Sequence, residues 1–142
     1  MDIDKIQKMW EKDSVIDDVM LDSATIKIPQ LHSKYLTLHN EYTLLMKKGK
    51  QELNRTIHLR TLYYSGRGAP EMYEEAPFNY KLIKSEVQSW VAVDDFVNKI
   101  EMKVALYETT LNTLSEILKQ IHQMSFNIKN IIAWRQFVNG AG

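Results

Sequence analysis

A basic segment near the middle of the chain holds the side chains best suited to bind a charged ligand. If this segment is helical, four cations and one histidine project within an arc of about 160°, because each residue advances about 100° around the axis. These five side chains, the basic ridge, are Lys47, Lys48, Lys50, Arg55 and His58. Met46, Leu53 and Ile57 cluster on another side of the same helix. One face can therefore follow a phosphate backbone while the other packs against the protein.

The residues after the ridge combine two arginines with two tyrosines. Arg60 projects about 220° from Lys47, beside the apolar cluster, so it can reach DNA from the edge of the ridge or serve as a structural cation. Tyr63 and Tyr64 follow, and Arg67 lies between two glycines. Cations interleaved with aromatic rings suit single strands, because each base offers a face for stacking and each phosphate a charge. The alternative is that the tyrosines belong to the core and the lysines are simply solvated.

Catalytic and metal-binding patterns are weak elsewhere in the chain. The sequence lacks GxxxxGK[ST], HExxH and GxSxG, and it has no cysteine, which excludes disulfides and thiol nucleophiles. His32 and His39 are two helical turns apart, too far to share a metal ion without a third ligand. Asp94 and Asp95 are expected to be solvated or intersubunit charges. We therefore expect no enzymatic activity, no metal and no cofactor.

Charge is balanced over the whole chain but segregated along it. Of the 18 basic and 18 acidic side chains, residues 1–26 carry 3 and 7, residues 27–68 carry 8 and 2, residues 69–118 carry 4 and 9, and residues 119–142 carry 3 and 0. Such segregation produces local fields that the zero net charge hides. The basic zones can bind nucleic acid, or they can pair with acidic faces of the same chain or of neighbouring subunits.

Length and composition indicate one globular or coiled-coil domain. The chain has 142 residues, of which 44% are apolar and 25% charged. After the acidic, amphipathic N-terminus, no apolar run is longer than four residues, the length of the run from Trp90 to Val93. We therefore expect no signal peptide, no membrane association and a cytoplasmic location.

Helical periodicity accounts for the first half of the chain. Residues 2–13 are predicted to form a short amphipathic helix. A second helix is expected to begin near Pro29, because proline fits a first helical turn, and to run to about Tyr64 with Gly49 as its weak point. The segment SGRGAP is predicted to form a loop that extends as far as Pro77. No stretch alternates with the period of a strand, so the predicted fold class is all-α.

The second half carries apolar residues in 3-4 alternation from Trp90 and Val93 through to Ile132. A period of 3.5 residues is typical of helices that wind around one another, so this part is predicted to assemble the protein. The segment HQMSFN is expected to interrupt it before a last short helix that reaches Val138. The residues expected to mediate assembly are Val104, Tyr107, Leu111, Leu114, Leu118, Ile121, Ile128, Ile131, Ile132 and Trp134.

Several segments resemble one known family in order and spacing. RTLYYSGRG (60–68), preceded by Ile57-His58-Leu59, resembles the DNA-binding segment of the UvsY-type recombination mediator proteins of T-even-like phages. KDSVID (12–17), HSKYL (32–36), KSE (84–86) and FNIKNIIAWRQF (126–137) are similar to other landmarks of that family. The resemblance spans nearly the whole chain.

The resemblance implies a non-enzymatic homo-oligomeric ring, a hexamer or heptamer, in the host cell cytoplasm. Such a ring binds and wraps single-stranded DNA, contacts a phage RecA-like recombinase and a phage single-strand-binding protein, and helps the recombinase load. It implies that residues 1–77 bind DNA and residues 78–142 assemble the ring. Arg60 takes the place of the family's DNA-contacting arginine, whereas His58 replaces a lysine. The rival interpretation is a structural or adaptor coiled coil that does not bind nucleic acid.

Overall fold

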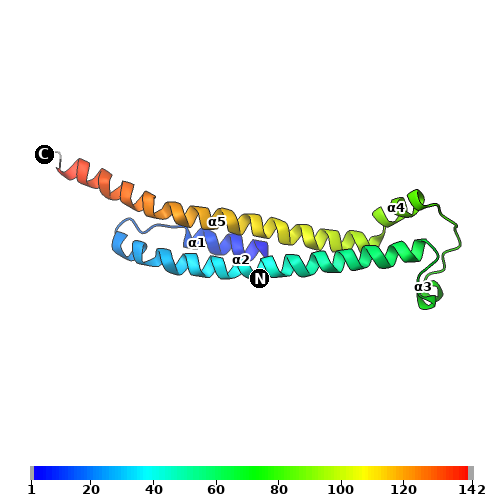
Figure 1. Cartoon of the computed structure of the whole chain (residues 1–142). Helices are drawn as coiled ribbons and strands as arrows, with labels where there is room; N and C mark the ends of the chain where they lie inside the picture. The colour runs from blue at the N-terminus through cyan, green and yellow to red at the C-terminus, as the bar shows by residue number, and fades with distance from the viewer. Residues whose placement is uncertain (1, 141–142) are drawn as a thin grey trace. The chain divides into compact units, whose positions relative to one another are not determined.

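The computed structural model describes residues 2–140, and this part of the chain is built from helices without a strand (Figure 1). The helices are α1 (Ile3–Asp13), α2 (Leu21–Tyr64), α3 (Pro70–Glu75), α4 (Lys84–Ala92) and α5 (Asp95–Gly140). The all-α prediction is confirmed. In the part of the chain that is described, no helix combines the length and the apolar character that crossing a bilayer requires.

The chain divides into two compact units, whose bounds differ from those of the predicted functional regions 1–77 and 78–142, and that functional division stays a prediction. The terminal unit comprises Met1–Thr43 and Thr109–Gly142, and the central unit comprises Leu44–Glu108. Both α2 and α5 contribute residues to both units. Apolar periodicity along one helix shows which positions are buried, but it does not show against which distant segment they pack.

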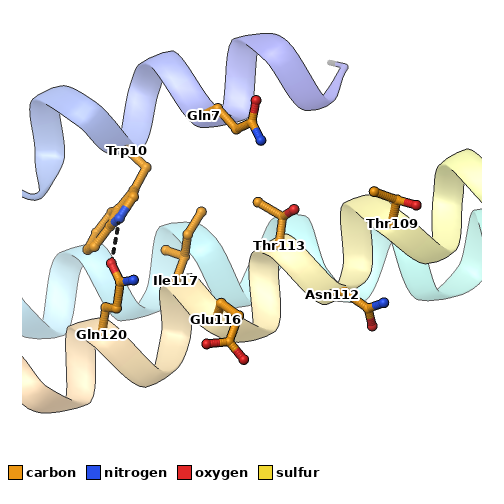
Figure 2. A pocket seen from close by; sticks show the side chains of 8 residues that line it. All are labelled: Gln7, Trp10, Thr109, Asn112, Thr113, Glu116, Ile117 and Gln120. Carbon is orange, nitrogen blue, oxygen red and sulfur yellow. Dashed lines mark hydrogen bonds between the residues drawn. The ribbon is translucent and has the colours of Figure 1, made fainter.

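In the terminal unit, α1 packs on the first half of α2 and on the middle of α5, between Thr109 and Gln120. Its N-terminus is capped by Asp2, whose side chain accepts a hydrogen bond from the Lys5 amide. Ile6 is fully buried. The indole N–H of Trp10 donates to Gln120 Oε1 over 2.9 Å, beside a groove of about 410 Å³ between α1 and α5 (Figure 2). A helix this short needs such tertiary contacts to persist.

Asp13 fastens the other end of α1 to α2. Its Oδ2 accepts hydrogen bonds from Lys34 Nζ at 2.7 Å and from the Tyr35 hydroxyl at 2.8 Å. Burial raises the pKa of the Asp13 carboxyl, but the bonds from Lys34 and Tyr35 outweigh it and lower that pKa below its ordinary value. Burial and the bond to Asp13 both raise the pKa of Tyr35, which is fully buried. The phenol therefore remains a neutral donor.

The second helix begins at Leu21, so the predicted start near Pro29 is wrong, and Pro29 lies inside α2. Asp17 lies just before the start of α2, and its Oδ1 accepts hydrogen bonds from the amides of Val19 and Met20. Proline inside a helix removes one backbone hydrogen bond and costs about 3 kcal/mol. The turn before it still packs, since Ala24 is buried in the terminal unit. Tertiary burial thus outweighs the local signal.

The last long helix is continuous through HQMSFN, so the predicted interruption at residues 122–127 is also wrong. Leu114, Ile121, Met124 and Ile128 form a buried stripe along α5. The polar residues Ser125 and Asn127 lie between the last two positions of this stripe. The segment contains neither glycine nor proline. Serine and asparagine lower helix propensity only slightly, and the burial of this stripe is sufficient to keep the helix intact.

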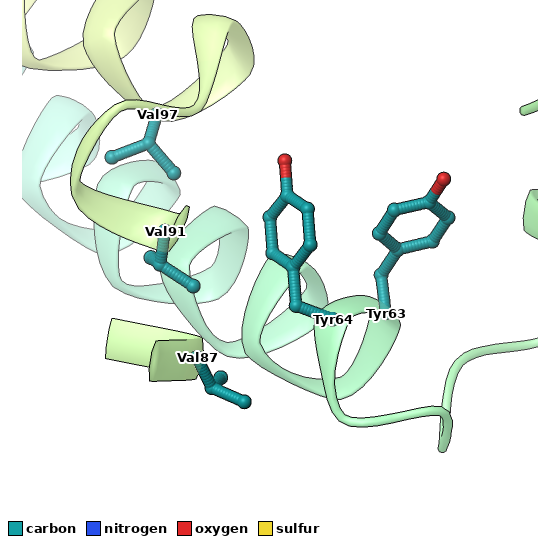
Figure 3. Packing of buried hydrophobic residues seen from close by; sticks show 5 residues of the cluster. All are labelled: Tyr63, Tyr64, Val87, Val91 and Val97. Atoms are coloured by element: carbon teal, nitrogen blue, oxygen red, sulfur yellow. The ribbon is translucent and has the colours of Figure 1, made fainter. Parts of the chain in front are cut away.

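In the central unit, the glycine in α2 allows two helices to approach closely. A Cβ atom at Gly49 would lie 3.1 Å from Val104 Cγ2 and 3.5 Å from Tyr107 Cδ2. The weak helix former at this position therefore permits contact between α2 and α5. Further along α2, the core consists of Tyr63, Tyr64, Val87, Val91 and Val97 (Figure 3).

The apolar seam predicted from Trp90 onward is broken between α4 and α5. Val93 lies at the break and is exposed, while Trp90 packs on the rings of Tyr64 and Phe78. Asp94 caps the new helix, because its Oδ1 accepts from the amides of Phe96 and Val97. Within the predicted 65–77 loop the chain also forms α3, with Pro70 in its first turn.

Candidate nucleic-acid interface

The basic ridge is exposed along the second half of α2, and every one of its five side chains faces solvent. Lys50 Nζ lies 3.5 Å from Glu108 Oε1, with both side chains about half exposed, so this pair is weak and easily exchanged for another anion. Lys47, Lys48 and Arg55 make no ion pair with any residue between 2 and 140. The ridge therefore has positive charges available for a ligand.

Arg60 has a different environment. Its Nε donates to Asp94 Oδ2 over 2.8 Å, and the two side chains are only 15% and 2% exposed. The guanidinium carbon lies 4.2 Å from the ring centroid of Tyr63, 5.3 Å from that of Tyr64 and 4.9 Å from that of Phe96. Aromatic faces attract a guanidinium, so Arg60 has an ion-pair partner and three ring partners within the chain.

Asp94 connects Arg60, Tyr64 and the start of α5. Besides the bond from Arg60, its Oδ2 accepts from the Tyr64 hydroxyl at 2.6 Å. Burial raises the pKa of the Asp94 carboxyl, but the Tyr64 hydroxyl, the Val97 amide and the Arg60 guanidinium outweigh it and lower that pKa. Burial and Asp94 together raise the pKa of Tyr64. Near neutral pH the site is a buried carboxylate with a neutral phenol and a cation.

The two predicted base-stacking residues are part of the core. Tyr63 and Tyr64 are only 4% and 9% exposed. Tyr63 stacks on Tyr73 with centroids 5.1 Å apart and donates a hydrogen bond to the Ala76 carbonyl. In this structure both rings are packed in the core, as the alternative interpretation predicted. Their stacking with bases stays a prediction that requires α3 and the segment after it to move.

The SGRG segment forms the C-terminal cap of α2. Gly66 adopts a left-handed φ of 77°, its amide donates to the Tyr63 carbonyl, and the Arg67 amide donates to the Leu62 carbonyl. This bonding pattern is the Schellman motif, in which glycine relieves the steric cost of the left-handed residue. The turn leaves the Arg67 side chain exposed, with no ion pair in the described part of the chain.

The residues expected to mediate assembly fall into two groups. The first group is buried or half-buried within the chain and consists of Val104, Tyr107, Leu111, Leu114, Leu118, Ile121, Ile128 and Ile131. The second group, Ile132 and Trp134, is exposed, and Trp134 stacks on the exposed Phe137 with centroids 5.9 Å apart. The heptad pattern is thus used largely for packing inside one chain. Its role between subunits stays a prediction.

Comparison with known proteins places these features in a family. A family model described as recombination, repair and ssDNA binding protein UvsY matches residues 9–141. The chain belongs to the UvsY family. The recombination protein uvsY of Enterobacteria phage T4 is 26% identical over 140 residues, which cover 99% of each chain. The resemblance seen in the sequence is thereby confirmed.

Solved structures agree with this assignment. The chain is similar to the bacteriophage T4 recombination mediator protein UvsY in lattice type II, with a TM-score of 0.84 and 26% identity over 100% of this chain and 99% of that one. Lattice type IV matches with a TM-score of 0.81 and 25% identity over 96% and 98%. The UvsY fold therefore extends over the whole described chain.

The role of Asp94 differs from the one predicted from the sequence. This residue was expected to be a solvated or intersubunit charge, but it is buried and partners both Arg60 and Tyr64. Its capping position offered a signal, since an aspartate two or three residues before an apolar helical repeat commonly begins a helix. In the described residues, no three His, Cys, Asp or Glu side chains gather as metal ligands would.

Proposed function

We propose that this protein is a non-enzymatic recombination mediator that binds single-stranded DNA along the basic ridge of α2. The observation that carries the proposal is the exposed row of cations without strong internal partners on one face of a helix, in a chain of the UvsY family. Cations bind phosphates in any sequence context, so this surface suits DNA of any base composition. The proposal assigns Arg67 to the same surface at the end of α2.

A single chain offers only a few phosphate contacts. With three or four phosphates neutralised, affinity falls with salt at a log–log slope of about −2 to −3 for a single strand. Such binding is weak for one subunit. Assembly repeats the contacts at high effective concentration and raises the overall affinity by about 10²- to 10⁴-fold.

The proposal therefore includes a homo-oligomeric ring of six or seven copies, with the single strand wrapped on its basic surfaces. A wrapped strand is withdrawn from the phage single-strand-binding protein and presented to a RecA-like recombinase, which is the loading function proposed here for the cytoplasm of the host. Residues 1–77 supply the DNA contacts in this scheme, and residues 78–142 supply the assembly contacts.

The exposed apolar end of α5 supports the assembly part. Ile132, Trp134, Phe137 and Val138 are all exposed there, and Trp134 is 66% exposed. Large apolar side chains gathered on a surface are typical of interfaces between proteins. Of the ten residues predicted to mediate assembly, Ile132 and Trp134 at this end are the two that are exposed in the described structure.

Native mass spectrometry with and without a fluorescein-labelled oligo(dT) tests the proposal. We expect one closed oligomer that gains oligonucleotide, and fluorescence anisotropy should show affinity falling steeply with salt. An oligomer that ignores oligo(dT) at low ionic strength would show that the protein is an adaptor coiled coil instead.

Assembly has its own test. Replacing Trp134 and Phe137 together with serine should release protomers that bind oligo(dT) about 10²-fold more weakly or worse, because the repeated contacts are lost. Sedimentation velocity reports the mass, and Gln136→Ser, on the same exposed end, is the matched control. An unchanged sedimentation coefficient for the double variant would exclude these side chains from the interface.

A further inference from the structure

A polar hollow lies between the end of α2 and the start of α4, within the central unit. Its volume is about 480 Å³, in the range of sites that bind small molecules. Seven residues line it, and none is acidic: Thr61, Ser65, Arg67, Leu82, Lys84, Val87 and Gln88. Two cations, one from the turn after α2 and one from the start of α4, therefore border one cavity.

The donors in this hollow are available for an anion. Neither Arg67 nor Lys84 forms an ion pair with any residue between 2 and 140, and both side chains are exposed. The nearby carboxylate of Glu86 accepts a hydrogen bond from the Ile83 amide and does not line the cavity. A guanidinium and an ammonium at one site match the charge of a phosphate and can supply several donors to its oxygens.

The hollow continues the same side of α2 that carries the basic ridge. At about 100° per residue, Thr61 and Ser65 project within the arc that the ridge cations occupy, whereas Arg60 projects away from it. His58 and Ser65 are separated by seven residues, which is about 10 Å along the axis. A strand that follows the ridge toward the C-terminal end of α2 therefore arrives at this cavity.

Packing of α4 against the core fixes the backbone near Lys84. Lys84 begins α4, and Val87, one turn further, is buried against Tyr63 and Tyr64 in the core cluster. Arg67 is held from the other side by the Schellman turn, through its amide bond to the Leu62 carbonyl. Core packing thus fixes the backbone near Lys84 and the capping turn fixes the backbone of Arg67, which lowers the entropy lost when the two cations bind a ligand.

We propose that Lys84 and Arg67 form a second phosphate-binding site, which takes one phosphodiester of the single strand as it leaves the ridge. This inference rests on the proposed function, since it assigns a further binding residue to the same DNA-binding surface. Lys84 thereby connects α4 to DNA binding, although it lies far in sequence from the basic segment.

Lys84→Gln tests the site, with Lys81→Gln as the matched control, because Lys81 is an exposed lysine three residues away that does not line the cavity. Affinity for fluorescein-labelled oligo(dT) is measured by anisotropy over a range of salt concentrations. We expect Lys84→Gln to weaken binding about 3- to 10-fold and to make the log–log salt slope shallower by about 0.7, the value for one phosphate. Lys81→Gln should stay within about twofold of the parent protein.

A double-mutant cycle then asks whether the two cations share one phosphate. If they do, Arg67→Gln combined with Lys84→Gln loses less affinity than the product of the single losses, because one contact cannot be lost twice. Equal effects of Lys84→Gln and Lys81→Gln, or strictly multiplicative losses in the cycle, would overturn the site while the proposed function stands. Failure of the parent protein to bind oligo(dT) would overturn both.

Discussion

Two faces of the second half of α2 carry positive charge in opposite environments. On one face, the ridge side chains are exposed, and the ion pair that one of them forms within residues 2–140, between Lys50 and Glu108, is half exposed on both sides. On the other face, Arg60 is surrounded by three aromatic rings and bonded to the buried carboxylate of Asp94. The first arrangement leaves charge for a ligand, whereas the second uses charge to join α2 to α5.

The comparison shows that charge and motif do not by themselves identify a contact residue. Arg60 and Arg67 belong to the same run of sequence and differ in what packs around them. Removing one partner of a buried ion pair destabilises the fold, because it leaves the other charge uncompensated. DNA contact by Arg60 stays a prediction, and in this structure it requires exchange of the Asp94 carboxylate for a phosphate.

The largest expected effect is on stability. Asp94→Ala removes the partner of Arg60, the acceptor of the Tyr64 hydroxyl and the cap of α5 together. We expect the free energy of unfolding to fall by about 3 to 5 kcal/mol, measured by urea denaturation followed by circular dichroism. Asp95→Ala, at the exposed neighbouring position, should cost less than about 1 kcal/mol. Equal costs would mean that the Arg60 site does not stabilise the fold.

Substitutions on the exposed face should change DNA binding strongly and stability little. Replacing Lys47, Lys48 and Arg55 together with glutamine should weaken oligo(dT) binding about 10²-fold and make the salt slope shallower by about 2, because three phosphate contacts are lost. The free energy of unfolding should change by less than about 0.5 kcal/mol per site, since these side chains are exposed. Anisotropy and urea denaturation measure the two quantities. A large loss of stability would contradict the proposed separation of roles.

The pH dependence of stability should also distinguish the Arg60–Asp94 site from the exposed basic ridge. The pKa of the Asp94 carboxyl is lower in the folded protein than its value of about 3.9 in the unfolded chain. The folded state therefore binds fewer protons, so this contribution to stability is present above about pH 4 and is lost as the pH falls through the folded pKa.

The measurement is the free energy of unfolding between pH 6 and pH 2.5. Asp94→Asn should have a shallower acid dependence than the parent protein, with the remaining slope due partly to Asp13, whose pKa is also lowered. Variants of the ridge should keep the parent slope. An Asp94→Asn curve parallel to that of the parent would show that the carboxylate gains nothing from its partners.

The smallest expected effect concerns the ridge position that departs from the family pattern. His58→Lys adds a charge that persists at all physiological pH values, which an imidazole does not provide. Affinity for oligo(dT) at pH 7.5 should rise about two- to fivefold, and the salt slope should become steeper by about 0.7. Anisotropy titrations measure both. An unchanged affinity would place His58 away from the strand.

Much of the fold was predictable because its signals are local. The periodicity of α1, the buried stripe of α5 and the stop after Tyr64 follow from apolar spacing and from the glycines of SGRG. The start of α2 was missed because packing outweighed the proline signal. The break before α5 was missed because the apolar repeat continues through Val93 in sequence while the backbone turns there.

The candidate interface likewise has one part that the sequence predicts and one part that depends on tertiary packing. The exposure of the basic ridge follows from the angular separation of its lysines and arginine from Leu53 and Ile57, which is a property of one helix. The environment of Arg60 and Tyr64 depends on Asp94, which lies 34 and 30 residues further along the chain. Periodicity cannot show which distant carboxylate meets a given cation, because that choice is made by the packing of two helices.

Residue order alone thus accounts for the all-α fold class, the exposed basic ridge of α2 and the family to which the chain belongs. The folded structure assigned the tyrosines and Arg60 to the core, used most of the heptad positions of α5 within the chain, and brought Lys84 beside Arg67. The physical reason is range: helix propensity and capping act over a few residues, whereas burial and charge pairing depend on segments that only the folded chain brings together.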